Sequence, residues 1–326
     1  MARLFRCAGV ALAGLACIGP TLAEEWPSRP MTMVVPFAAG GPADTVGRIL
    51  APRLGELLGQ QVIVENMGGS GGMTGTSRVA KAAPDGYQFV LGNMGTHAAN
   101  QTFYKTPLYN AATDFAPVML IAQTPLVLLA RKDLPANTLP EFIAYAKAKQ
   151  VTMQFGSGGA GSASHLACAL LNSAIGINVT HVPYRGAAPA MQDLIAGRIG
   201  YQCPDTPIAI PQIAGGAIKA IAILTRDRSL SLPEQASAHE QGLTDFNASN
   251  WFALFLPKGT SSETIEKLHA AARATIDTPA VKLRMREIGA DLPADARRSP
   301  DYLQRFVERE IEKWARPIKA SGISMD

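Results

Sequence analysis

One unit, a strand followed by a glycine-rich loop and a helix, occurs near the start of this chain and again near its middle. The first copy has a β-rich run at 31–35, the loop PFAAGGPA at 36–43 and apolar side chains at helical spacing over 44–58, with Asp44 as the expected N-cap. The second copy has a strand at 151–155 and the loop GSGGAGS at 156–162. Strand, loop and helix in this order favour an α/β fold with doubly wound parallel sheets.

Further strands and helices follow the same pattern. Strands are predicted at 62–65, 87–91, 179–182, 200–203 and 219–224, and helices at 76–82, 139–149, 163–174 and 188–196. The 30 glycines and 23 prolines among 326 residues suit many short units better than a long helical bundle.

Two apolar stretches, 116–131 and 250–257, interrupt the pattern and read as passages between two lobes. The tail from 261 to 318 reads as two helices separated near 290–299, with Thr260 or Ser261 as N-cap. We therefore predict a discontinuous first lobe, 24–122 with 252–326, and a second lobe, 123–251. A chain that leaves a lobe and returns to it joins the two lobes by at least two passages, which is the geometry of a hinge.

The first 23 residues have the composition of an export signal. Arg3 and Arg6 precede an apolar run at 7–19, and Thr21-Leu22-Ala23 offers a cleavage site of small residues. We expect a signal peptide at 1–23 and an exported mature protein that begins near Glu24. Processing as a lipoprotein at Cys17 is the alternative, although residues 14–16 lack the large aliphatic residue that such a site begins with.

Charge and hydrophobicity exclude several classes of protein. The formal charge of +4 falls to about +2 when Arg3 and Arg6 leave, and no block of Lys and Arg forms a footprint for nucleic acid. Hydrophobic residues make up 47% of the chain, enough for a core, but no run after the export segment reaches the ~18 apolar residues of a membrane span. We expect a soluble mature protein.

Two cysteines remain in the mature chain, Cys168 and Cys203. Exported proteins form disulfides, but free cysteines are also among the most buried residue types. Two buried free thiols are the preferred interpretation, and a bridge between them stays open.

The glycine loops suit anion binding. A loop of this kind, between a strand and a helix, aims backbone N–H groups into a concavity with the positive end of the helix dipole behind them. Two such loops facing each other would hold the two ends of a dicarboxylate. The alternative is that the glycines only make tight turns.

Several motif matches are rejected. Residues 156–161 fit the dinucleotide pattern G-x-G-x-x-G, but the next strand ends at 181–184 without the carboxylate that holds a ribose. Residues 68–72 fit G-x-S-x-G, yet a flexible run of glycines does not impose the strained turn of a nucleophile elbow. No P-loop follows either glycine loop. We expect no cofactor.

Catalysis and metal binding find little support. His165 and Cys168 have a ligand-like spacing, but an imidazole facing the loop above a core cysteine is the simpler interpretation. Ser162 and His165 are too close in sequence to indicate a triad. Three strand-end residues suit ligand contact instead: Tyr184 and Arg185 for a carboxylate, and Asp205 for a ligand hydroxyl or amine. An N-cap or turn role is the alternative for Asp205.

At this point the chain resembles the substrate-binding receptors of tripartite tricarboxylate transporters, also called the Bug family. The resemblance covers the whole mature chain and rests on six segments in a characteristic order: WPSRP at 26–30, PFAAGGPAD at 36–44, PDGY at 84–87, 156–166, VPYRG at 182–186 and PKG at 257–259. It implies a two-lobed periplasmic binding protein of the Venus-flytrap type II-like class, a monomer that hands a small mono- or dicarboxylate to a membrane permease.

The resemblance also implies a ligand site between the lobes, held largely by backbone amides. Together with the strand-end residues above, the expected ligand-binding residues are Phe37, Ala38, Ala39, Gly40, Gly41, Thr96, His97, Ser157, Gly158, Gly161, Ser162, Tyr184, Arg185 and Asp205.

Three departures from the family pattern matter. Residues 66–72 read NMGGSGG where the family has NRPGAGG, which loses a cation and a proline and should loosen the loop. The aspartate expected after the hairpin at Gly197 is displaced, with Pro204 in its place and Asp205 next. Gly200 replaces a common acidic residue.

The sequence thus predicts a carboxylate receptor without enzymatic activity. Two rivals stay open: an exported hydrolase that uses Ser157 or Ser162, and a sensory receptor that presents its ligand to a signalling partner.

Overall fold

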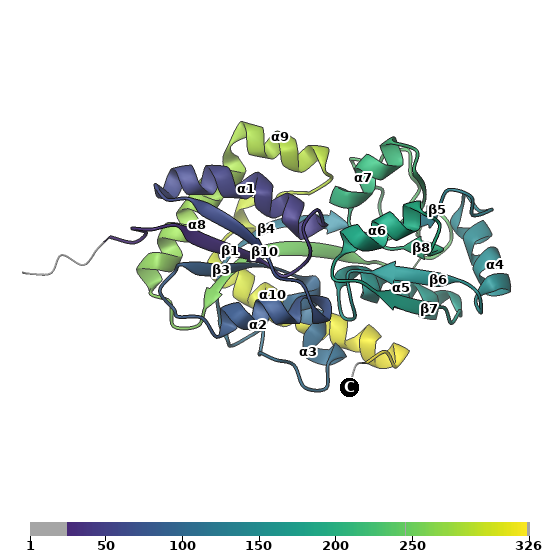
Figure 1. Cartoon of the computed structure of the whole chain (residues 1–326), viewed down its shortest axis with the longest axis horizontal. Coiled ribbons are helices and arrows are strands. Elements are labelled where there is room, and N and C mark those ends of the chain that lie inside the picture. Colours follow the sequence, from purple (N-terminus) through teal and green to yellow (C-terminus); the bar gives the residue numbers. More distant parts are fainter. Residues whose placement is uncertain (1–24, 245, 325–326) are drawn as a thin grey trace, which may run out of the picture.

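The computed structural model describes residues 25–244 and 246–324. The predicted export segment, with Cys7 and Cys17, lies outside the described residues. Two α/β lobes lie side by side, each built on a five-stranded sheet (Figure 1). None of the helices in the described part of the chain combines the length and the apolar character that crossing a membrane requires.

The first sheet has the strand order β2-β1-β3-β10-β4. Its strands are β1 (Met31–Val35), β2 (Val62–Asn66), β3 (Gln88–Asn93), β4 (Phe115–Pro125) and β10 (Ser249–Pro257). Strands β1, β2 and β3 run parallel, whereas β10 is antiparallel to both β3 and β4.

The second sheet has the strand order β7-β6-β8-β5-β9. Its strands are β5 (Val127–Arg131), β6 (Gln154–Ser157), β7 (Thr180–Pro183), β8 (Tyr201–Gln202) and β9 (Ile218–Ile223). Strand β6 is parallel to β7 and β8, and β5 is antiparallel to β8 and β9. The two-lobed α/β fold is confirmed, but the prediction of purely parallel sheets was wrong. Strands β10 and β5 come over from the other lobe and so enter their sheets in the reverse direction.

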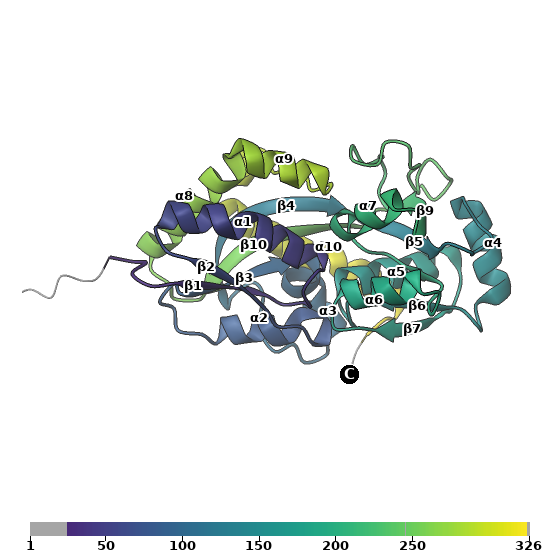
Figure 2. The same cartoon turned by 45° about the horizontal axis from the view of Figure 1, so that its top comes forward.

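The chain changes lobe within very few residues. Only Leu126 separates β4 of the first sheet from β5 of the second. On the return, the N–H of Ala248 still donates to Leu224 at the end of β9, and Ser249 already begins β10. Both passages therefore lie next to each other at the junction of the lobes (Figure 2).

Helices cover both faces of each sheet. The described helices are α1 (Pro42–Leu58), α2 (Met73–Ala80), α3 (Asn100–Phe103), α4 (Leu139–Lys149), α5 (Ala163–Ile175), α6 (Ala187–Ile195), α7 (Thr206–Ala214), α8 (Ser262–Asp277), α9 (Pro279–Glu287) and α10 (Pro300–Ser321). Helices α1, α8 and α9 share one core of the first lobe, and α2, α3 and α10 cover the opposite face of its sheet. In the second lobe α6 and α7 cover one face, and α4 and α5 the other.

Two details of the predicted helices were wrong. Helix α1 begins at Pro42 with Gly41 as N-cap, because a proline at the first helical position loses no hydrogen bond. Asp44 lies inside the first turn instead. The tail forms three α-helices, not two, because Pro279 starts α9 directly after α8 ends. Ser261 is confirmed as the cap of α8, since its Oγ accepts from the N–H of Thr264.

The C-terminal helix α10 joins the lobes from below. It packs against β4 and α3 of the first lobe and reaches α5 of the second. Buried Glu310 anchors it, because its carboxylate accepts from Nε1 of Trp251 in β10 at 3.0 Å and from Nε1 of Trp314 at 3.1 Å. The helix therefore fixes one side of the junction between the lobes.

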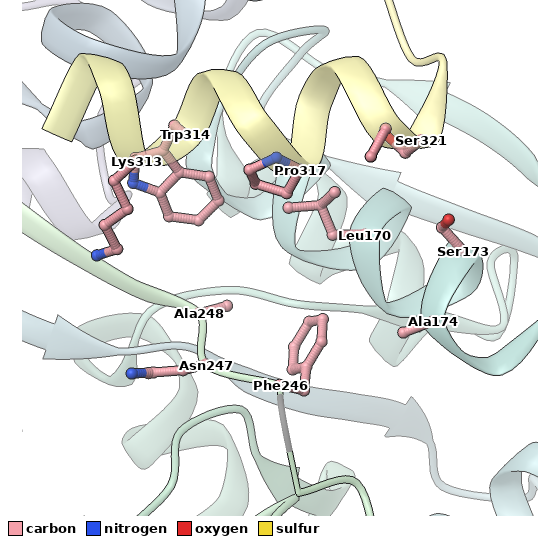
Figure 3. A pocket seen from close by; sticks show the side chains of 11 residues that line it. Leu170, Ser173, Ala174, Phe246, Asn247, Ala248, Lys313, Trp314, Pro317 and Ser321 are labelled. Atoms are coloured by element: carbon pink, nitrogen blue, oxygen red, sulfur yellow. The ribbon is translucent and has the colours of Figure 1, made fainter.

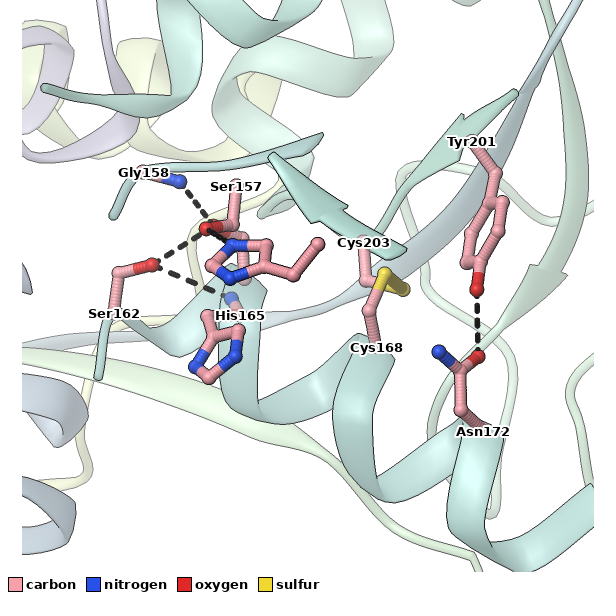
Figure 4. The surroundings of a disulfide bond; sticks show 10 residues. Ser157, Gly158, Ser162, His165, Cys168, Asn172, Tyr201 and Cys203 are labelled. Atoms are coloured by element: carbon pink, nitrogen blue, oxygen red, sulfur yellow. Dashed lines mark hydrogen bonds between the residues drawn. A yellow bond between two sulfur atoms is a disulfide. The ribbon is translucent and has the colours of Figure 1, made fainter. Parts of the chain in front are cut away.

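The preferred interpretation of Cys168 and Cys203 as free thiols was wrong, because they form a disulfide (Figure 4). Cys168 lies on α5 and Cys203 directly follows β8, with their Cα atoms 5.5 Å apart and both side chains fully buried. Helix α5 packs across the sheet above β8, which brings together two cysteines that are 35 residues apart. A separation of this size in the sequence gives no sign of that proximity.

We predict that the double variant Cys168→Ala/Cys203→Ala loses about 2–4 kcal/mol of unfolding free energy, because the unfolded chain gains freedom when the bridge is absent. Urea unfolding of the variant and of wild type measures the loss. Dithiothreitol should destabilise wild type by a similar amount and leave the variant unchanged. Equal unfolding midpoints for oxidised wild type and the variant would contradict the prediction.

Candidate functional site

A small cavity lies between the two lobes. Its volume is about 30 Å³. Residues of both lobes line it: Phe37, Pro42, Ala43, Asn93, Gly158, Ser162, Ala163, Ser164, Ala187, Asp205, Asn250 and Phe252. The lining includes no Lys or Arg. This space holds about two water molecules, so a larger ligand enters only when the lobes move apart.

The beginnings of four helices meet at this cavity. Pro42 and Ala43 open α1, Ser162 caps α5, Ala187 opens α6, and Asp205 holds the N-cap position of α7 without a capping hydrogen bond from its side chain. The first N–H groups of a helix have no acceptor within it, and the helix dipole puts partial positive charge at the same end. Four such ends form an environment that favours an anion without a cationic side chain.

The loop before α5 is the more open of the two to a ligand. The Oγ of Ser162 accepts from the N–H of His165, and the Oγ of Ser164 accepts from the N–H of Gly158 at 2.9 Å. The N–H of Gly161 donates to Nδ1 of His165, which confirms the imidazole facing the loop. These contacts hold the loop in shape and leave the opening N–H groups of the helix, at Ala163 and Ser164, without an acceptor inside it.

Ser157 lies at the end of β6 and is fully buried. Its Oγ is 2.6 Å from Nε2 of His181, a pairing that the sequence analysis missed. The imidazole of His181 stacks on the rings of Phe155 and His165. These neighbours are not carboxylates and so do not orient it as a catalytic base. Burial lowers the pKa of His181 to about 4, so it is a weak base at neutral pH.

The loop before α1 has fewer donors to spare. The N–H of Gly40 donates to Oδ2 of Asp44 at 2.8 Å, and the N–H of Ala38 donates across to the carbonyl of Arg185 at 3.1 Å. Of the predicted loop residues only Phe37 lines the cavity, while Ala39 and Gly40 are exposed. Asp44 itself places a carboxylate at the start of α1, held there by Arg48 and Asn66. Hydrogen bonds from these groups keep the pKa of Asp44 below its usual value, although burial opposes them.

Tyr184 and Arg185 follow β7 and do not line the cavity. The hydroxyl of Tyr184 donates to Oδ2 of Asp193 at 2.6 Å. The side chain of Arg185 is exposed, whereas its backbone carbonyl contacts the first lobe.

Thr96 and His97 are both fully buried and also do not line the cavity. His97 stacks face to face on Phe255, with ring centroids 3.9 Å apart, and its Nδ1 is 2.9 Å from Oγ1 of Thr96. Burial lowers the pKa of His97 to about 3. The pair belongs to the core of the first lobe. Asn93, which ends β3 shortly before Thr96 and His97, lines the cavity instead.

Asp205 is the acidic residue of the cavity. Its Oδ1 accepts from Oγ1 of Thr124 in β4 at 2.8 Å and from Nδ2 of Asn250 in β10 at 2.7 Å. Its side chain is almost wholly buried. Burial raises the pKa of Asp205 to about 6, because these two hydrogen bonds compensate only part of the lost hydration.

The cavity residues that the sequence analysis missed fall into three groups. Pro42, Ala43, Ala163, Ser164 and Ala187 directly follow predicted loop residues, so the helix starts themselves were the signal. Asn93 ends β3, shortly before the predicted Thr96 and His97. Asn250 and Phe252 belong to the return passage at 250–257. Most of this run is apolar, so nothing in the sequence indicated that Asn250 lines the cavity.

A second hollow of about 400 Å³ lies at the other end of α5 (Figure 3). Leu170, Phe246, Trp314 and Pro317 give it mainly apolar walls, and Lys313 at its edge is paired with Glu310 at 2.9 Å. It lacks the converging helix starts of the first cavity. Within 25–244 and 246–324, no three His, Cys, Asp or Glu residues are grouped so that they could hold a metal ion.

Two α/β lobes joined by two adjacent chain passages, with a cavity between them, define the class of periplasmic binding proteins, and solved structures of that class superpose closely. The structure of the periplasmic binding protein BugD is 36% identical, with a TM-score of 0.90 over 92% of this chain and 100% of that one. MatC from Rhodopseudomonas palustris with bound malate is 37% identical, with a TM-score of 0.88 over 90% of this chain and 100% of MatC. Another R. palustris protein, with adipate, is 35% identical, with a TM-score of 0.88 over 92% of this chain and 99% of that one.

The profile described as the tripartite tricarboxylate transporter family receptor matches residues 46–323. The chain belongs to this family of solute-binding receptors, as the sequence motifs predicted.

We predict that Asp205 makes the stability of the protein depend on pH between about 4 and 6. Because its pKa is higher in the folded than in the unfolded chain, its contribution is most favourable below about pH 4 and is lost as the pH rises through about 6. Asp205→Asn keeps an oxygen that accepts both hydrogen bonds but carries no charge. The unfolding free energy of wild type minus that of Asp205→Asn should therefore fall by on the order of 3 kcal/mol across this range.

Urea unfolding of both proteins from pH 4 to pH 8 measures this difference. Groups other than Asp205 titrate in both proteins and cancel. A difference that stays constant, or that grows with pH, would show that the folded protein does not disfavour the ionised carboxyl.

Proposed function

We propose that this protein captures a small mono- or dicarboxylate between its lobes and delivers it to the permease of a tripartite transporter. The observation that carries the proposal is the convergence of four helix N-termini, from both lobes, on one cavity without a lining cation. Backbone N–H groups and helix dipoles stabilise a carboxylate there.

The two sides of the cavity take different parts in this proposal. The start of α5, at Ala163 and Ser164, binds one carboxylate through N–H groups that have no acceptor within the helix. The first-lobe loop at Phe37 to Gly41 closes over the ligand from the other side. Malate and adipate in two related structures support a carboxylate as the ligand class.

Asp205 contributes selectivity in this scheme. An ionised Asp205 repels a carboxylate placed next to it but accepts a hydrogen bond from a ligand hydroxyl or amine. Its raised pKa lets it also bind a ligand as the neutral acid at mildly acidic pH. We propose that Asp205 favours ligands with a hydroxyl or amine substituent between or beside their carboxylates.

The location and partners follow from the same proposal. An export signal at 1–23 would direct the chain to the periplasm, and a disulfide between Cys168 and Cys203 suits that oxidising compartment. We propose a monomer there, whose closed, ligand-bound form the permease recognises.

Binding is tested by titrating C4 to C6 dicarboxylates and short monocarboxylates into the purified protein, with calorimetry and thermal unfolding as readouts. We expect saturable binding by at least one of them and a matching rise in melting temperature, since a ligand bound only to the folded state stabilises it. Ligand recovered unchanged after denaturation supports a receptor. Absence of binding by every carboxylate would contradict the proposal.

A hydrolase that uses Ser157 is the second candidate function, which the Ser157–His181 pair favours. That rival predicts turnover of ester or amide substrates, and loss of turnover in His181→Gln. The full burial of Ser157 and the low pKa of His181 both count against it.

The role of backbone donors has its own prediction. Ala163→Pro should weaken carboxylate binding by about 10-fold to 100-fold, because it removes one N–H at the first position of α5, where proline fits a helix. Ala163→Val is the matched control: it has as many side-chain carbons as proline and keeps the N–H. Equal losses in the two variants, by calorimetry, would mean that bulk rather than the lost donor is responsible.

A further inference from the structure

The glycine segment 68–72, with the sequence GGSGG, faces the second lobe but takes no part in the cavity. None of its residues is among those that line the cavity. Its glycines therefore need a reason other than contact with a ligand.

A side chain on this segment would strike the second lobe. A Cβ added to Gly71 would lie 2.0 Å from the carbonyl oxygen of Ala160 and 2.9 Å from the amide nitrogen of Ser162. A Cβ added to Gly68 would lie 2.5 Å from the carbonyl oxygen of Arg185. Atoms of separate residues do not approach this closely, so either side chain would push the lobes apart.

The second lobe has glycines at matching places. A Cβ on Gly161 would lie 2.2 Å from Oδ1 of Asn100, and one on Gly186 would lie 2.9 Å from the amide nitrogen of Ala38. Gly95 of the first lobe completes the set, since its Cβ would lie 2.9 Å from the carbonyl oxygen of Gly161. We name Gly68, Gly71, Gly95, Gly161 and Gly186 the closing seam.

Backbone conformation does not explain all five glycines. Gly71 and Gly161 have φ of +59° and +81°, which favour glycine by themselves. Gly186 is extended, with φ of 172°, and Gly68 and Gly95 are outside the left-handed region. At these three positions it is the opposite lobe that excludes a side chain.

Hydrogen bonds join the lobes directly along this seam. The N–H of Ala38 donates to the carbonyl of Arg185 at 3.1 Å, and the hydroxyl of Tyr104 donates to the carbonyl of Ala160 at 2.8 Å. Backbone groups of two lobes reach each other at this distance only where no side chains intervene. The seam thus brings two loops into backbone contact around the cavity.

We infer that the closing seam determines whether the lobes can close, and that Gly71 is its most restrictive position. The role of closure in holding a carboxylate rests on the proposed function. The contact itself does not, because its geometry is independent of any ligand.

Gly71→Ala tests the inference against Gly59→Ala as the matched control. Gly59 has a similar φ of +71°, but no atom lies within 4 Å of the added Cβ, so both variants carry the same backbone strain and only one meets the other lobe. Amide hydrogen exchange at Ala38 reports closure without any ligand, through its bond to Arg185. Calorimetry with malate and adipate as probes reports its effect on binding.

We expect the exchange protection of Ala38 to fall at least tenfold, and the Kd for a bound probe to rise at least tenfold, in Gly71→Ala relative to Gly59→Ala. Gly68→Ala, which has no φ strain, should act in the same direction. Matching melting temperatures for Gly71→Ala and Gly59→Ala show that both fold equally well. If Gly71→Ala is the less stable of the two, Gly68→Ala decides the comparison.

The outcomes separate the two proposals. Equal protection and equal affinity in the two variants overturn the closing seam, even if malate or adipate binds wild type. Loss of protection confined to Gly71→Ala and Gly68→Ala supports the seam, even if wild type binds no carboxylate, in which case the proposed function fails alone.

Discussion

The buried carboxylate of Asp205 is the interaction on which the junction of the lobes depends. It belongs to the start of α7 in the second lobe, yet both of its hydrogen-bond donors, Thr124 and Asn250, lie on the two strands that carry the chain between the lobes. Asn250 in turn accepts from the N–H of Met94 at the end of β3. One acidic group therefore joins the cavity wall to both passages, and its burial in this position has an electrostatic cost that its raised pKa records.

The two glycine loops, alike in sequence, differ in what they have left to offer. At the start of α1 the protein supplies its own anion, because Asp44 lies in the first turn and accepts from Gly40. At the start of α5 no acidic residue occupies the first turn. Partial positive charge that is already neutralised does not attract a second anion as strongly. The asymmetry places most of the attraction for a carboxylate on the second lobe.

Much of the fold could be predicted from the order of elements, because strand, glycine loop and helix leave few ways to bury their apolar faces. The direction of β5 and β10 could not, since it depends on which lobe a strand comes from. Among the predicted site residues, Phe37, Gly158, Ser162 and Asp205 line the cavity, because strand ends and helix starts meet at one edge of a sheet. Thr96 and His97 follow a strand end too, but a core of aromatic rings encloses His97. Neither that enclosure nor the proximity of Cys168 to Cys203 leaves a local pattern in the sequence.

The position of β10 has a consequence for how the molecule is assembled. Residues 249–257 lie between β3 and β4, so β4 has no neighbour in the first sheet until the chain has been made as far as Pro257. Every strand of the second sheet, together with both cysteines of the disulfide, lies between Val127 and Ile223. The second lobe can thus complete its sheet and its disulfide before β10 is present to complete the sheet of the first lobe. The lobe that begins first in the sequence is the one that finishes last.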